Sequence, residues 1–144
     1  MIPVHFPKPD FKIQHQDHKE IIFDPFRKLW VVLTPEEWVR QNFLQWLVQV
    51  MEYPPSLISI EREMMLGELR KRFDIVVYNK AAKPWILVEC KAMGVPLGEE
   101  VLQQVLRYNQ ALEVCYLIIT NGSFTKGFKL LPQVSEIDIL PDFA

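Results

Sequence analysis

The stretch that decides the fold runs from Arg72 to Ala92 and reads RFDIVVYNKAAKPWILVECKA. It contains two apolar, β-branched runs, Phe73–Tyr78 and Trp85–Cys90, joined by the turn-like NKAAKP. Runs of this length and composition, separated by turn residues, predict two neighbouring strands. Everything else in the chain is interpreted outward from this pair.

Each of these strands carries an acid in an otherwise apolar run, Asp74 in the first and Glu89 in the second. Lys91 follows Glu89 by two positions, and residues i and i+2 of a strand project from the same face. Pairing of the two strands would bring Asp74 beside them. Two carboxylates and an ammonium group on one sheet face suit a divalent metal and a phosphate. An inert ion pair is the alternative, but burying three charges seldom adds stability.

Length and composition indicate one folded domain. The chain has 144 residues, of which 49% are hydrophobic and 24% charged, which allows a sizeable core. No apolar run reaches the roughly 20 residues needed to cross a membrane, and the N-terminus lacks the pattern of a signal peptide. Cys90 and Cys115 lie in apolar runs and are expected to be reduced and buried, so we expect a cytoplasmic protein. The sequence contains no Gly-rich phosphate loop, so we expect no ATP site in this chain.

The order of elements predicts an α/β fold with a central mixed β-sheet flanked by helices. We expect a single domain over residues 1–144, with an irregular N-terminal arm over residues 1–19 and a core from about 34 to 121. The unit from Trp85 to Thr120 should form a parallel, right-handed crossover. Further strands are expected at Glu20–Phe23, Leu29–Leu33, Leu57–Met65, Val114–Thr120, Phe128–Leu131 and Glu136–Leu140, with helices from Pro35 to about Met51 and at Glu99–Leu112.

These elements resemble the PD-(D/E)XK nuclease superfamily, and most closely the small N-terminal nuclease-like domain of type I restriction enzyme R subunits. The resemblance covers about Thr34 to Asn121 and is carried by PEEWVRQ, RFDIVVY, VECKA and QVLRY. Asp74, Glu89 and Lys91 match the two acids and the lysine of the superfamily motif. The proline that usually precedes the first acid is replaced here by Phe73, at a position that varies widely.

The resemblance implies a restriction-endonuclease-like core with Mg²⁺-dependent phosphodiesterase activity on DNA, with Mn²⁺ as an alternative ion. Asp74, Glu89 and the backbone carbonyl of Cys90 would then supply the oxygen ligands that Mg²⁺ prefers. Lys91 would act as the catalytic base or as an electrostatic stabiliser of the charge developing on the phosphate. Gln104 and Tyr108 match the Gln-x-x-x-Tyr element found in a subset of the superfamily, and would support the site.

The resemblance also implies an acid on the first helix, for which Glu36 and Glu37 compete. Helical phase puts Glu36 on the same side as the core residue Val39, which favours Glu36 for the site. Glu37 has a capping role, because Thr34, Pro35 and Glu37 form a helix-start pattern. Glu36 could also simply stabilise the helix dipole. Arg40 is expected to pair with Glu36 four residues earlier or to reach a DNA phosphate.

A net charge of −2 excludes DNA binding by bulk charge, so a nucleic-acid partner would need a local basic patch. The other candidates for phosphate contacts are Arg70, Lys71, Arg72 and Arg107, and the patch could also include Arg62, Lys91, Lys126 and Lys129. The expected partners are DNA and either a second copy of the chain or a larger restriction or repair assembly, with no membrane. The alternative function is a catalytically idle nuclease-fold module for DNA binding or protein assembly.

Overall fold

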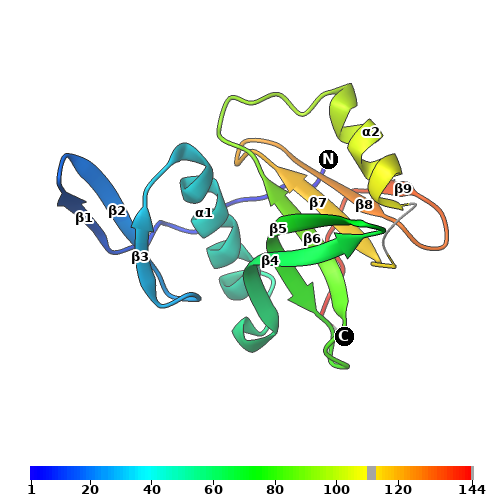
Figure 1. Cartoon of the computed structure of the whole chain (residues 1–144), viewed down its shortest axis with the longest axis horizontal. Helices are drawn as coiled ribbons and strands as arrows, with labels where there is room; N and C mark the ends of the chain where they lie inside the picture. Colours follow the sequence, from blue (N-terminus) through cyan, green and yellow to red (C-terminus); the bar gives the residue numbers. More distant parts are fainter. Residues whose placement is uncertain (110–112, 144) are drawn as a thin grey trace.

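The computed structural model describes residues 1–109 and 113–143, and it arranges them as two sheets and two α-helices (Figure 1). The smaller sheet has the strand order β1-β2-β3, and the larger has the order β4-β5-β6-β7-β8-β9. The elements are β1 (Ile13–Gln16), β2 (Lys19–Asp24), β3 (Leu29–Val32), α1 (Pro35–Gln49), the 3₁₀ turn η1 (Pro55–Leu57), β4 (Ile58–Leu66), β5 (Leu69–Tyr78), β6 (Pro84–Cys90), α2 (Glu99–Asn109), β7 (Tyr116–Thr120), β8 (Thr125–Lys129) and β9 (Ser135–Ile137).

The larger sheet is mixed, as predicted. β6 and β7 pair in parallel, with α2 as the crossover between them, while the other neighbouring strands pair antiparallel. The predicted helix at Glu99–Leu112 is described only as far as Asn109, and its last turn lies outside the described residues. None of the described helices has the length and apolar character required to span a membrane.

The two faces of the larger sheet hold separate apolar clusters, one under each helix (Figure 1). This follows from strand geometry over residues 75–77 of β5 and 86–88 of β6, where successive side chains point to opposite faces. The α1 face buries Phe43 and Leu47 against Ile75, Val77, Ile86 and Val88. The α2 face buries Val101 against Phe73, Val76 and Leu87. The prediction of helices on both faces of a central sheet is therefore confirmed.

α1 begins where the sequence predicts. The Thr34 hydroxyl accepts the Glu37 N–H at 3.0 Å, and Pro35 occupies the first turn, where its missing N–H costs nothing. The helix lies between the two sheets (Figure 1), so it is covered on the side of the larger sheet and on the side of the smaller one. Buried polar residues such as Gln41 and Asn42 result from this double contact.

The prediction of an irregular arm over residues 1–19 holds for residues 1–12, which form no helix or strand, but is wrong for residues 13–19, which form β1, a turn and the start of β2. Gln16 faces Lys19 in a hairpin whose two turn residues, Asp17 and His18, have φ values of 51° and 64°, as two-residue hairpin turns require. β1 is polar and exposed along its length, so its hydrophobic pattern gives no indication of a strand. Further upstream, Ile2 is buried and its N–H donates to the Thr125 carbonyl at 2.9 Å.

Candidate active site

The predicted acids lie where two central strands stop pairing with each other. The last antiparallel pair between β5 and β6 is Ile75 with Val88. Asp74 and Glu89 are the residues that follow this last pair in the ladder. From there on, β5 remains paired only with β4, and β6 only with β7. The Cys90 N–H donates to the Asp74 carboxylate at 2.9 Å. The strands therefore bring Asp74 and Glu89 together at a break in the hydrogen-bonded ladder.

Asp74 carries a negative charge that its surroundings compensate only in part. Burial raises the pKa of Asp74 to about 6, and the nearby carboxylates of Glu36 and Glu89 also raise it. The Cys90 N–H and the Arg40 guanidinium act in the opposite direction. A cation at this position would favour the ionised carboxylate, as a positive neighbour does for any buried acid.

Glu89 is buried on the α2 face, with 3% of its surface exposed. The Lys71 ammonium lies 3.1 Å from one of its carboxylate oxygens, and the Gln104 side-chain amide of α2 donates to the other. The structure thus brings the predicted supporting residue Gln104 to the predicted acid. Lys71, a candidate for a DNA phosphate, is paired with Glu89, and its ammonium also lies 5.9 Å from the centre of the Phe73 ring.

Lys91 directly follows β6 and is half-buried. Its backbone N–H donates to the Thr120 carbonyl at 2.7 Å, which fixes it at the end of the parallel pair β6–β7. Within the part of the chain that the structure describes, the Lys91 ammonium forms no ion pair. The Tyr108 side chain lies outside the described residues, so its predicted role stays a prediction.

The two helix acids have different surroundings. Glu36 is exposed, yet its charge still acts on Asp74. The expectation that Glu36 lies on the buried side of α1 and that Glu37 projects elsewhere is wrong. Glu37 is 4% exposed and accepts hydrogen bonds from Arg40 at 2.8 and 3.1 Å, from Arg27 at 3.0 Å and from Gln41 at 3.1 Å. Its position is occupied by structural contacts, which leaves Glu36 as the helix acid that a bound cation could recruit.

Arg40 also differs from its prediction. It pairs with Glu37 rather than with Glu36, because α1 turns Glu37 toward the same interior. Only 6% of Arg40 is exposed, and one of its terminal nitrogens lies 3.3 Å from both a Glu61 oxygen and an Asp74 oxygen. Arg40 therefore has little surface for a DNA phosphate and acts instead on the acid at the strand break.

Sequence reasoning missed a network of charges that extends from the smaller sheet to Asp74. Arg27, in the turn after β2, pairs with the fully buried Asp24 and also reaches Glu37 at 3.0 Å and Glu61 at 3.2 Å. Glu61 and Arg40 then complete the path to Asp74. The charged pair in the turn DPFR between two apolar strands is the one sequence feature that could have indicated it.

Glu61 is exposed, and its carboxylate pairs with Arg27 and Arg40 rather than with its closer neighbours in sequence, Arg62, Arg70 and Arg72. Its backbone φ is +53°, in the left-handed region that side chains other than glycine seldom adopt. The pairs on either side of it, Ile60 with Ile75 and Arg62 with Phe73, put it opposite Asp74 across β4 and β5. A strained residue held in this way is typical of functional sites.

The donor set suits Mg²⁺ better than a metal that needs a complete protein cage. Among residues 1–109 and 113–143, no three His, Cys, Asp or Glu side chains are close enough to hold a metal. Mg²⁺ commonly takes one or two carboxylates and completes its shell with water and substrate phosphate. Asp74 and Glu89 are the two carboxylates that could serve such an ion. In the network of Arg27 and Arg40, four carboxylates face two guanidiniums, which leaves a net negative charge.

The remaining basic candidates take no part in the described ion pairs of the acid cluster. Arg70, Arg72 and Arg107 are exposed, and none of them forms an ion pair with the described residues. Each could contact a phosphate, and each stays a prediction.

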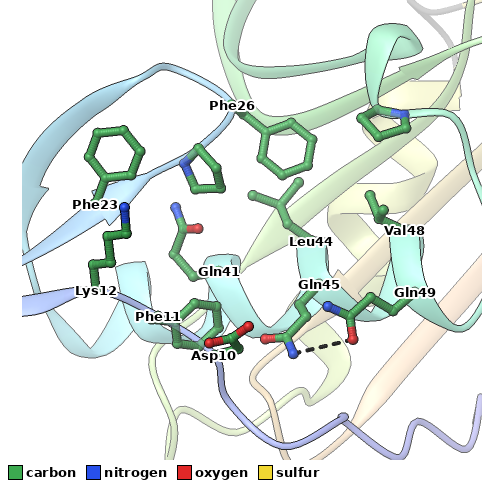
Figure 2. A pocket seen from close by; sticks show the side chains of 12 residues that line it. Asp10, Phe11, Lys12, Phe23, Phe26, Gln41, Leu44, Gln45, Val48 and Gln49 are labelled. Atoms are coloured by element: carbon green, nitrogen blue, oxygen red, sulfur yellow. Dashed lines mark hydrogen bonds between the residues drawn. The ribbon is translucent and has the colours of Figure 1, made fainter.

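A separate cavity of about 420 Å³ lies between the segment before β1, the end of β2 with its following turn, and α1 (Figure 2). Its walls are mainly apolar and include Phe11, Phe26 and Leu44. Figure 2 shows the Gln45 amide beside Gln49, to which it donates at 3.5 Å. Neither Asp74 nor Glu89 lines this cavity, so the cavity is separate from the acid site.

Comparison with known proteins agrees with this geometry. The family model described as the Type I restriction enzyme R protein N terminus (HSDR_N) matches residues 35–143. A crystal structure of a candidate nuclease belonging to DUF820, from Anabaena variabilis ATCC 29413, is similar with a TM-score of 0.53 and 11% sequence identity, covering 96% of this chain and 86% of that one. The type IIG restriction endonuclease BpuSI aligns with a TM-score of 0.41 and 23% identity, over 75% of this chain and 13% of that one. No curated protein matches.

Proposed function

Because the chain belongs to the family of the type I restriction enzyme R protein N terminus, as a nuclease-like domain, we propose that it is a Mg²⁺-dependent DNA endonuclease that hydrolyses phosphodiester bonds. The observation that carries the proposal is the break between β5 and β6, where Asp74 and Glu89 meet without full charge compensation. A structural ion network would be expected to neutralise such a buried carboxylate, since an uncompensated buried charge is costly.

Asp74 and Glu89, with the Cys90 carbonyl, would hold the Mg²⁺ ion. When bound, the ion supplies positive charge to the scissile phosphate and lowers the pKa of an attacking water. Gln104 holds one oxygen of Glu89 and Lys71 pairs with the other. The oxygen beside Lys71 would become the metal ligand if Lys71 contacted the substrate phosphate instead. Lys91 orients the water or stabilises the charge that develops on the phosphate oxygens. Mn²⁺ is expected to replace Mg²⁺, because it also prefers oxygen ligands.

One observation favours the alternative of an idle module. Both acids already have basic partners, Arg40 on Asp74 and Lys71 on Glu89. A domain that has stopped cleaving DNA could retain its acids in such pairs while still binding DNA or assembling with other subunits. Titration calorimetry with Mn²⁺ distinguishes the two functions, because the idle module should bind no ion even when DNA is present.

Cleavage of supercoiled plasmid with Mg²⁺ or Mn²⁺ tests the proposal directly. We expect the wild type to nick the plasmid, and Glu89→Gln and Lys91→Ala to reduce the rate by about 10²–10³-fold, the usual effect of removing one preorganised electrostatic group. Lys80→Ala, at an exposed lysine in the turn between β5 and β6, is the matched control and should cleave normally. Equal background cleavage by all four proteins would leave the idle module as the function.

Gln104 offers a second test, because its neighbour Gln103 is an exposed glutamine on the same helix. Gln104 positions Glu89 through a hydrogen bond, and removal of a group that orients a metal ligand typically costs 10–100-fold in metal affinity or activity, so about tenfold is expected for Gln104→Ala. Gln103→Ala should match the wild type. Mn²⁺ affinity and cleavage rate should fall together, and an equal loss in both variants would indicate a general effect on α2.

A further inference from the structure

The loop after β7 displays an aromatic ring on a rigid support. The Asn121 side chain accepts the Ser123 N–H at 2.9 Å and the Phe124 N–H at 2.7 Å, and the Asn121 N–H donates to the Phe124 carbonyl at 3.1 Å. These bonds fix the backbone of the loop completely, yet 55% of Phe124 is exposed. A large apolar side chain held outward in this way is typical of recognition surfaces, because little conformational entropy is lost on binding.

Two further apolar side chains lie on the adjoining loop after β6. Met93 is 56% exposed and Val95 is 41% exposed. The two loops are joined by the Asn121 amide, which donates to the Val95 carbonyl at 2.8 Å. They are also packed closely at Gly122, where a Cβ would lie 3.2 Å from a Val39 methyl and 3.5 Å from the Met93 side chain. A hollow of about 440 Å³ separates Phe124 from the Val95–Leu97 segment.

This apolar surface adjoins the acid site. Thr120 connects the two, because its carbonyl accepts the Lys91 N–H at 2.7 Å and its hydroxyl donates to the Phe124 carbonyl at 3.3 Å. Sheet register aligns Glu89, Ile119 and Lys126 across β6, β7 and β8. Lys126 therefore lies two strands, roughly 10 Å, from Glu89. It forms no ion pair with the residues that the structure describes, and it also borders the hollow.

We propose that Phe124 stacks on an unpaired nucleobase of the DNA strand whose phosphate is bound at Asp74 and Glu89, and that Lys126 contacts the backbone of the same strand. This inference rests on the proposed function and specifies its substrate as single-stranded or locally unpaired DNA. The Phe124 ring suits the flat base of a nucleotide, and the Lys126 ammonium suits its anionic phosphate. Bases inside a duplex have both faces covered, whereas an unpaired base presents one, and base–aromatic stacking is tolerant of sequence.

The test compares binding of a dye-labelled oligodeoxythymidine with binding of a fully paired duplex by fluorescence anisotropy, with Ca²⁺ in place of Mg²⁺ so that the DNA remains intact. Phe124→Ala should weaken single-strand binding about tenfold, as expected for one lost stack, and duplex binding by less than about twofold. Phe124→Trp should restore single-strand affinity. Leu29→Ala, which removes an exposed apolar side chain on β3 of the smaller sheet, should change neither.

Three outcomes would overturn the inference. Unchanged single-strand affinity in Phe124→Ala, with wild-type binding and cleavage intact, would reject the stacking role alone and leave the nuclease function in place. A loss of self-association in Phe124→Ala, seen by light scattering without a change in DNA affinity, would assign the surface to protein contact instead. Failure of the wild type to bind either DNA would reject the inference together with the proposed function.

Discussion

Asp74→Asn is expected to abolish metal-dependent cleavage and, at the same time, to stabilise the metal-free protein above about pH 7. Burial raises the pKa of Asp74 from its ordinary 3.8 to about 6. A carboxyl group whose pKa is raised by folding favours the folded state below its unfolded pKa, and this contribution is lost as the pH rises through about 6. At neutral pH the ionised Asp74 therefore costs roughly 2–3 kcal/mol, which the neutral asparagine avoids.

The measurement is urea unfolding in the presence of a chelator at about pH 5 and pH 8. The stability gain of Asp74→Asn should be only about half its full size at the lower pH, where the folded carboxyl is mostly protonated but the unfolded one is already ionised, and should be largest at the higher pH. Asp10→Asn, at an exposed aspartate, provides the control and should show no such pH-dependent difference. Loss of activity with a gain of stability is typical of residues retained for function. A variant less stable than the wild type at both values would instead assign Asp74 a structural role.

Much of the fold was predictable because the central elements follow simple periodic patterns. The apolar runs of β5, β6 and β7 and the capped start of α1 were predicted close to their observed positions. The polar β1 was not, because a strand that is exposed along its length carries no alternation of apolar and polar residues. β1 forms because it pairs with β2 in a hairpin, and the composition of residues 13–16 alone does not predict that pairing.

The acids of the site were predictable from the sequence, but the contacts that support them were not. Asp74 and Glu89 stand out because charge inside an apolar strand is unusual. Arg27 and Glu61 do not stand out in sequence, and they meet only because the smaller sheet packs beside α1. The same packing explains the error over the helix acids. A helix with a single buried face would put Glu37 in solvent. Because α1 is also covered on the side of the smaller sheet, Glu37 is buried there.

Glu37→Ala is expected to destabilise the protein by about 3–5 kcal/mol, the usual cost of removing one partner from a buried ion pair. Glu37 accepts hydrogen bonds from two arginines, Arg27 and Arg40, and from Gln41. Its removal leaves the buried Arg40 with only long contacts of 3.3 Å to Glu61 and Asp74. The N-cap would persist, because Thr34 accepts the backbone N–H of residue 37 rather than its side chain.

Glu36→Ala is the matched control for that loss, since it removes the same side chain one position earlier. Glu36 is exposed and lies in the first turn, so its removal should cost less than about 1 kcal/mol. Its effect should appear instead as weaker Mn²⁺ binding, because its charge acts on Asp74. Urea unfolding and Mn²⁺ calorimetry on both variants thus separate the two neighbouring acids. Equal losses of stability would show that Glu36 also belongs to the structural network, and the helix would then contribute no acid to the metal.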